Sequence, residues 1–140
     1  KIPHRWEFRH DHIGYNYRMP NINAALGCAQ LENLDRYVAD KRETAACYAE
    51  FFKGKEDITF FTEPADCKSN YWLNAVVLKD KAAQLDFLEY TNDHGVMTRP
   101  VWELMNRLLM FEHCETDGLE NTEWLADRVV NIPSSVRLDK

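Results

Sequence analysis

The chain has 140 residues and a formal net charge of −6, and its 45% hydrophobic content is ordinary for a globular protein with one moderate core. Its 17 basic residues are scattered among 23 acidic ones, so no basic stripe is available for nucleic acid or an anionic membrane. No apolar run approaches the roughly 18 residues of a membrane helix. We therefore expect one domain that binds neither nucleic acid nor membrane.

Residues 1–19 are polar and rich in aromatic side chains, with little periodicity, which predicts a loop or extended arm. Pro20 suits the first turn of a helix, and apolar residues at three- and four-residue steps predict one long helix over 20–53. Gly54 is the expected C-terminal cap. Gly27 inside this helix costs about 1 kcal/mol relative to alanine, so we expect a close helix or backbone approach there.

The rest of the chain alternates between strand and helix patterns. Strands are predicted first at 57–61 and 70–78, then at 96–99 before Pro100, and last at 129–132, whereas helices are predicted at 82–92 and 120–127, and 101–110 is helical or irregular. This order predicts an α/β (α+β) module, 20–140, whose helices pack on a small, mostly antiparallel sheet. The arm, 1–19, precedes it.

Four cysteines lack any paired spacing: Cys28, Cys47, Cys67 and Cys114. This spacing argues against a zinc knuckle or a redox pair and favours reduced thiols in the cytosol. His10, Asp11 and His12 are suitable ligand types for a metal, but no further ligand follows at a helical or hairpin spacing. We therefore expect a cytoplasmic protein without a metal site, and a solvated or interface loop at His10 and His12.

The arm carries the most recognisable chemistry, just before the helix start. Gly14 allows close backbone approach, Asn16 offers an amide donor, and Arg18 offers a planar fork suited to phosphate or carboxylate. Composition alone leaves open an aromatic loop that packs on its own domain, with Arg18 in a surface ion pair.

Together with the residues that follow, this loop resembles the signature of the DegT family of pyridoxal-phosphate sugar aminotransferases. The shared positions are Gly14, Tyr15, Asn16, Tyr17, Arg18, Met19, Pro20, Asn21, Asn23, Ala24, Ala25, Leu26, Gly27, Gln30, Leu31 and Glu32. The resemblance implies the C-terminal small domain of a fold-type-I aminotransferase. It also implies a homodimer whose loop crosses the interface, with Asn16 facing the cofactor phosphate and Arg18 close to cofactor or substrate.

A second resemblance begins at Gly95 and includes Arg99, Pro100, Val101 and Trp102. Family members that aminate nucleotide-linked 4-keto-6-deoxy sugars have a similar segment at the mouth of the active site, which implies that Arg99, Trp102 and Asn106 contact the substrate. The family typically has His where Asn106 stands, so no catalytic role is expected at this position. In the alternative interpretation, Trp102 and Phe111 belong to the core and Arg99 caps a strand end with a surface carboxylate.

Four further segments resemble enzymes that make 4-amino sugars for legionaminic or bacillosamine-type bacterial glycans: 71–74, 89–92, 119–121 and 129–135. The resemblance thus extends from about residue 4 to residue 137. It implies transfer of an amino group, with glutamate as the expected donor, to a nucleotide-linked sugar in surface-glycan biosynthesis. Tyr71 and Trp72 are expected to pack in a strand rather than to contact a ligand.

In the family, the lysine that forms the Schiff base lies some tens of residues before the loop, whereas Lys1 stands only thirteen residues before Gly14. We therefore expect the C-terminal part of an enzyme, with no catalytic residue of its own and no activity alone. Two alternatives stay open. One is a sugar dehydratase in which His replaces the lysine, and the other is a non-catalytic binding or dimerisation module of the same fold.

Overall fold

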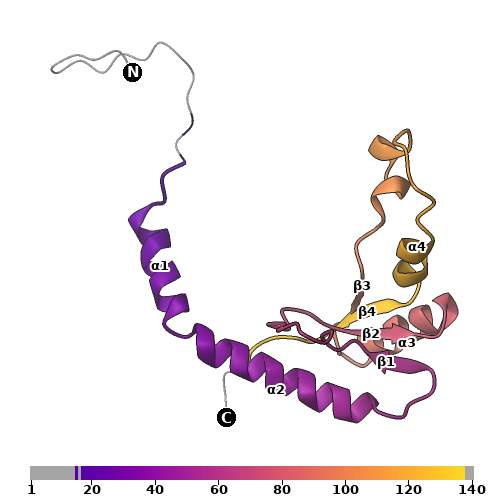
Figure 1. Cartoon of the computed structure of the whole chain (residues 1–140), viewed down its shortest axis with the longest axis horizontal. Helices are drawn as coiled ribbons and strands as arrows, with labels where there is room; N and C mark the ends of the chain where they lie inside the picture. Colours follow the sequence, from indigo (N-terminus) through magenta and orange to yellow (C-terminus); the bar gives the residue numbers. More distant parts are fainter. Residues whose placement is uncertain (1–14, 16, 138–140) are drawn as a thin grey trace. The chain divides into compact units, whose positions relative to one another are not determined.

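The computed structural model of the chain describes residue 15 and residues 17–137 (Figure 1). The chain divides into two compact units, 1–34 and 35–140. The first contains helix α1, Asn21–Leu31. The second contains nearly all of helix α2, Leu34–Phe52, and the whole sheet with its other helices.

The single helix predicted over 20–53 is wrong, because the chain forms two helices separated by a turn at Glu32 and Asn33. In a continuous helix the Asn33 backbone N–H would bond to the Ala29 carbonyl. Instead the Asn33 backbone N–H donates to the Gln30 carbonyl at 3.1 Å, and the Asn33 side-chain amide donates to the Ala29 carbonyl at 3.0 Å. An asparagine side chain that competes with the backbone in this way ends the first helix.

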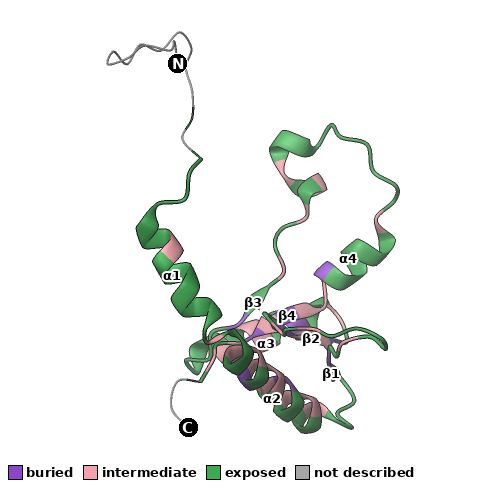
Figure 2. Cartoon of the chain, turned by 60° about the vertical axis from the view of Figure 1, so that its left-hand side comes forward, coloured by how far each residue is buried: buried purple, intermediate pink, exposed green. Residues whose placement is uncertain are grey.

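Helix α1 begins directly after Pro20, whose extended backbone makes it the N-cap and not, as predicted, a residue of the first turn. None of its residues is buried within the described chain, and Figure 2 shows the helix largely exposed. The close approach expected at Gly27 is not seen among the described residues, because a Cβ built there would meet no atom within 4 Å. Ile22, Leu26 and Leu31 all have large exposed fractions.

The four strands form one sheet in the order β1, β2, β4, β3, with every neighbouring pair antiparallel. Their bounds are Ile58–Phe60 for β1, Asn74–Leu78 for β2, Arg99–Pro100 for β3 and Val129–Ile132 for β4. The expected antiparallel sheet with helices packed on it is confirmed. Strand β3 is an edge strand, where a proline that lacks an N–H is tolerated.

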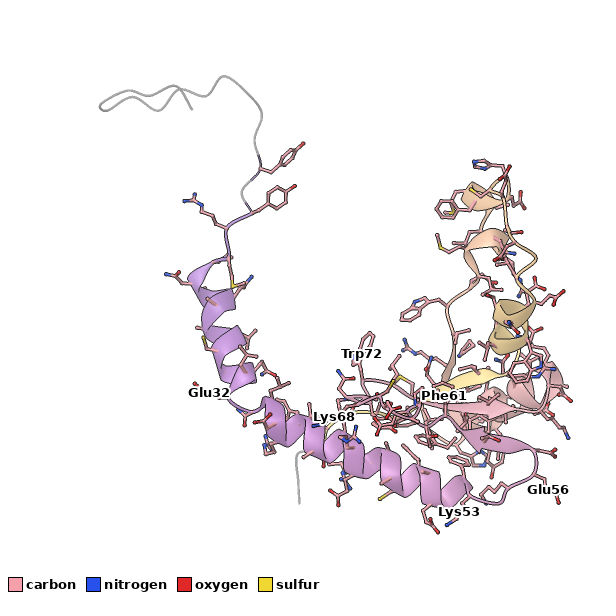
Figure 3. All side chains as sticks on the ribbon, in the orientation of Figure 1. Glu32, Lys53, Glu56, Phe61, Lys68 and Trp72 are labelled. Carbon is pink, nitrogen blue, oxygen red and sulfur yellow. The ribbon has the colours of Figure 1, made fainter. Side chains whose placement is uncertain are left out.

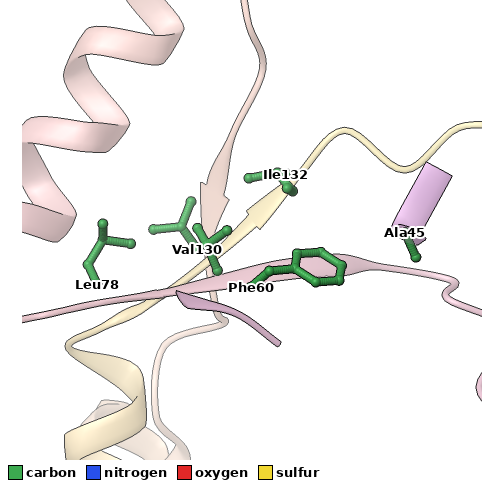
Figure 4. Packing of buried hydrophobic residues seen from close by; sticks show 6 residues of the cluster. Ala45, Phe60, Leu78, Val130 and Ile132 are labelled. Atoms are coloured by element: carbon green, nitrogen blue, oxygen red, sulfur yellow. The ribbon is translucent and has the colours of Figure 1, made fainter. Parts of the chain in front are cut away.

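The core lies between one face of this sheet and two helices. Val76 on β2 is the register partner of Val130 on β4, and both are fully buried. The remaining buried members of this cluster, shown with Val130 in Figure 4, are Ala45 on α2, Phe60, Leu78 and Ile132. Helix α3, Lys81–Asp93, packs Ala83, Phe87 and Leu88 against the same cluster.

Buried and capping hydrogen bonds fix the helices that follow β2. Asp80 caps α3, since its carboxylate accepts from the Ala83 N–H at 2.9 Å. The fully buried Gln84 donates its side-chain amide to the carbonyls of Ala126 and Val129, each at 2.9 Å. Gln84 thereby ties α3 to the junction between α4, Glu120–Ala126, and β4.

The segment between β3 and α4 contains only two short 3-10 helices, Met105–Arg107 and Leu109–Phe111, in agreement with the expected helical or irregular stretch. Among the described residues, no helix combines the length and the apolar character needed to cross a bilayer.

Candidate functional site

A pocket of about 530 Å³ lies where the edge strand β3 pairs with β4. It unites two of the residues that the sequence assigned to substrate, Arg99 and Trp102. The remaining lining comes from both sides of the β3–β4 edge and from the loop before β2: Trp72, Leu73, Met97, Pro100, Val101, Asn131 and Ile132. One cationic side chain therefore stands in largely apolar and aromatic surroundings.

The pairing of β3 with β4 fixes the base of this pocket. Arg99 is the register partner of Asn131, and Pro100 is the register partner of Val130. Directly paired residues project from the same face of a sheet, so Arg99 and Asn131 stand side by side. The Asn131 amide also donates to the Pro100 carbonyl at 3.5 Å, a long hydrogen bond across the edge.

The guanidinium of Arg99 is exposed, and its Nη2 lies 3.5 Å from the Met97 sulfur. Other arginines of the same unit form ion pairs with carboxylates: Arg42 with Glu63, and Arg137 with Asp40. In the part of the chain that the structure describes, no carboxylate pairs with Arg99, so the predicted strand-end ion pair is not the arrangement seen. The N–H groups of the guanidinium can donate hydrogen bonds to a phosphate or a carboxylate.

The backbone before Arg99 is held by a small buried network. Thr98 is only 4% exposed, and its hydroxyl lies 2.6 Å from that of Thr91 near the end of α3. Asn92 donates to the Thr98 hydroxyl at 3.0 Å and to the Thr98 carbonyl at 3.2 Å. The end of α3 thus fixes the entry into β3, and with it the position from which Arg99 extends.

Two tryptophans form the aromatic part of the pocket lining. Trp102 is 80% exposed, so its interpretation as a core residue is wrong. Trp72 is 67% exposed and lines the pocket, although the sequence favoured strand packing for it. Its neighbour Tyr71 does pack structurally, against Phe60 at a centroid distance of 6.4 Å.

The sequence did not predict that Trp72 lines the pocket, because this position depends on strand pairing. Asn74 is the register partner of Ile132, so the loop before β2 ends beside the end of β4, one strand from Arg99. Only the order of strands in the sheet reveals this neighbourhood. No local pattern around Trp72 distinguishes it from a residue that packs in a strand.

The structure does not bring Asn106 to the Arg99 pocket. Asn106 lines a separate pocket of about 480 Å³, which it shares with Met105, Phe111 and Cys114. Phe111 is 36% exposed at this second pocket and is therefore not a buried core residue. Asn106 lies in the 3-10 helix Met105–Arg107, which follows Trp102 in the chain.

The arm is described only in part. Asn16 and the metal-ligand candidates His10, Asp11 and His12 lie outside the described residues. Arg18 is exposed and belongs to the first unit. Tyr15 and Tyr17 are 79% and 90% exposed, so these two aromatic side chains do not pack on their own unit in the described chain.

No lysine is among the residues that line the Arg99 pocket. Lys79 pairs with Asp57 and Lys81 pairs with Asp127, and neither carboxylate lines this pocket. Among the described residues, the pocket therefore offers a guanidinium and aromatic walls but no lysine for covalent attachment of an aldehyde. Within the described residues, no cluster of three or more side chains suits a metal ion.

A charged cluster anchors the loop that carries Trp72. The Arg42 guanidinium bonds to both carboxylate oxygens of Glu63, at 2.6 and 3.0 Å, and Ser69 donates its N–H to the same carboxylate. The hydrogen bond from Arg42 is the main cause that lowers the pKa of Glu63 to about 2, and the Ser69 N–H adds to it. Glu63 therefore stays ionised at any physiological pH.

Comparison with known proteins agrees with this geometry. Residues 3–140 match the model of the DegT/DnrJ/EryC1/StrS aminotransferase family. GDP-perosamine synthase of Escherichia coli O157:H7 is 32% identical over 130 residues, which cover 91% of this chain and 34% of that protein. EpsN of Bacillus subtilis strain 168, which is named as a pyridoxal phosphate-dependent aminotransferase, is 30% identical over 133 residues. The match covers 91% of this chain and 34% of EpsN.

Among solved structures, Helicobacter pylori PseC, an aminotransferase involved in the biosynthesis of pseudoaminic acid, superimposes with a TM-score of 0.84 at 21% identity. The superposition covers 98% of this chain and 38% of PseC, and it shows a shared fold. The chain spans about one third of the length of the curated relatives it matches. Because the family match extends over nearly every residue, the chain belongs to the DegT/DnrJ/EryC1/StrS aminotransferase family.

Proposed function

We propose that the chain is part of a pyridoxal-phosphate-dependent aminotransferase that moves an amino group from glutamate to a nucleotide-linked 4-keto-6-deoxy sugar. The observation that carries this proposal is the Arg99 guanidinium, which faces a pocket with two exposed tryptophans and pairs with no carboxylate among the described residues. Family membership and the relative named GDP-perosamine synthase support the same reaction class. The setting we propose is surface-glycan biosynthesis by a cytoplasmic homodimer.

In this proposal Arg99 binds the anionic part of one substrate. A planar guanidinium suits either the diphosphate of a nucleotide sugar or the carboxylate of glutamate. Trp72 and Trp102 supply flat apolar faces against which a sugar or a base can lie. Asn106 lines the second pocket, so its predicted substrate contact requires a ligand that reaches from one pocket to the other.

The cofactor contacts rest on the family resemblance. We propose that Asn16 binds the cofactor phosphate across the dimer interface and that Arg18 lies close to the cofactor or the substrate. Pyridoxal phosphate, when bound, supplies the electron sink for amino transfer. No described lysine lines the Arg99 pocket. We therefore propose that this part of the protein positions the substrate and balances its charge, and that a lysine outside the described residues holds the cofactor.

The test is a product assay with the protein that the complete gene encodes, supplied with pyridoxal phosphate, glutamate and GDP-, dTDP- or UDP-linked 4-keto-6-deoxy sugars. The proposal predicts a 4-amino sugar nucleotide together with one equivalent of 2-oxoglutarate. A 3-deoxygenated keto sugar would instead identify a dehydratase. Formation of neither product with any of these sugars would favour a non-catalytic binding or dimerisation module.

A further inference from the structure

The loop that carries Trp72 is held by a cation on α2 that does not itself line the Arg99 pocket. The Lys41 ammonium donates to the Trp72 carbonyl at 3.4 Å and to the Ser134 carbonyl. We infer that Lys41 is a positioning residue, which sets the place of Trp72 and thereby the affinity of the Arg99 pocket for its substrate. This inference rests on the function proposed above, because it concerns the same pocket.

The two carbonyls that Lys41 joins belong to the two chain segments on this side of the pocket. Trp72 and Leu73 lead into β2, and Ser134 follows the end of β4 at Ile132. Ser134 also links these segments directly, since its hydroxyl accepts from the Asn74 N–H and donates to the Ile132 carbonyl, each at 2.7 Å. Lys41 therefore links the two segments that carry Trp72, Leu73 and Ile132 of the pocket lining.

The position of Trp72 depends on polar contacts rather than on packing. Its side chain is 67% exposed and projects outward from the loop (Figure 3). Its backbone N–H donates to the Asn70 side chain at 3.0 Å, and its carbonyl accepts from Lys41. Loss of the Lys41 ammonium would release one of these two backbone contacts, with little core packing to compensate.

The adjacent residue on α2 holds the other end of the same loop. Arg42 donates to the Ser69 carbonyl at 2.6 Å and pairs with Glu63, and its guanidinium lies 5.6 Å from the Tyr71 ring centroid. Arg42 thus holds the loop at Glu63, Ser69 and Tyr71, whereas Lys41 contacts Trp72, which lines the pocket. The Lys41 contact can therefore be removed while the loop stays attached to α2.

The first test records the environment of Trp72 directly, in the complete protein labelled with 5-fluorotryptophan. The Trp72 fluorine resonance is assigned with Trp72→Phe, and Trp124 on α4 serves as an internal reference. Lys41→Met is expected to shift or broaden the Trp72 resonance and to leave the Trp124 resonance in place. Lys41→Arg, which keeps a cationic donor, is expected to restore the wild-type Trp72 signal.

A matched control comes from an exposed lysine just after the same helix. Lys53 pairs with Glu50 and does not line the pocket, so Lys53→Met should change neither tryptophan signal. Melting temperatures of all variants show whether each one folds. An unchanged Trp72 resonance in folded Lys41→Met would overturn the inference.

The second test measures affinity for GDP, dTDP and UDP as probes. Lys41→Met should bind the preferred nucleotide about tenfold more weakly, which corresponds to about 1.4 kcal/mol, and Lys41→Arg and Lys53→Met should bind it like the wild type. Equal affinity in Lys41→Met, despite a displaced Trp72, would refute the role in binding. If the wild type binds none of the three probes, the nucleotide-binding part of the proposed function fails, while the Trp72 resonance still decides whether Lys41 positions the loop.

Discussion

Asn92 donates its side-chain amide to both the hydroxyl and the backbone carbonyl of Thr98, at 3.0 and 3.2 Å. Thr98 immediately precedes Arg99 and is only 4% exposed. The last turn of α3 is thus fastened to the start of the edge strand at the residue before the exposed guanidinium. An exposed cation on a fixed backbone is suited to bind an anion with little loss of conformational entropy.

Thr98→Val should destabilise the protein, because it removes the buried Thr98 hydroxyl and its two hydrogen bonds, with the Thr91 hydroxyl and the Asn92 amide, while the side-chain shape is kept. The expected loss is about 2 kcal/mol of unfolding free energy, since one hydrogen bond contributes about 1 kcal/mol net. Urea unfolding measures it. The matched control is Thr59→Val on β1, where the exposed threonine should tolerate the change. Equal stability of the two variants would show that the Thr98 network contributes nothing.

Gln84→Met should be more costly, since it removes the hydrogen bonds of Gln84 with the Ala126 and Val129 carbonyls and with the Lys81 ammonium, and it leaves both carbonyls without this donor. We expect a loss of about 2 to 4 kcal/mol, because each buried acceptor left unsatisfied costs about 1 to 3 kcal/mol. Thermal or urea unfolding, with Gln30→Met on the exposed surface of α1 as the control, provides the comparison. A Gln84→Met variant as stable as its control would exclude Gln84 as the tie between α3 and the α4–β4 junction.

The Arg42–Glu63 pair predicts a defined pH dependence of stability. The folded-state pKa of Glu63 is lowered from 4.5 to about 2, so its contribution is fully present above pH 4.5 and is lost as the pH falls towards 2. The melting temperature of wild type should therefore exceed that of Glu63→Gln by a constant margin above about pH 5 and by a shrinking margin below it. A margin that stays constant from pH 6 down to pH 2.5 would contradict the role assigned to this carboxylate.

Several elements follow directly from residue patterns. Strand 129–132 was predicted with the bounds that the structure shows, because a short apolar run stands between a helix end and Pro133. The antiparallel α/β module and the helix 82–92 also emerge from periodicity and turn residues. That Arg99 and Trp102 line the same pocket could be predicted, since they lie three residues apart at the end of a predicted strand.

Other features depend on contacts that local patterns do not encode. The break between α1 and α2 results from one asparagine side chain, Asn33, that competes with its own backbone. Strand β2 begins at Asn74 rather than at residue 70, because Tyr71 has a positive φ of 46°, which a strand cannot contain. Trp72 lines the pocket only because of the order of the strands, and Asn106 lies in a 3-10 helix that lines the second pocket instead.

The most direct test of the account is the kinetics of Arg99→Lys in the complete enzyme. Lysine keeps the charge but loses the planar fork, so the KM for one substrate should rise about tenfold while the melting temperature of this exposed site stays unchanged. The control is Arg107→Lys, whose arginine pairs with Glu103 and Glu123 and does not line the pocket. A higher KM for glutamate assigns Arg99 to its carboxylate, and a higher KM for the sugar nucleotide assigns it to the diphosphate or sugar. Wild-type KM values for both substrates in Arg99→Lys would contradict the account.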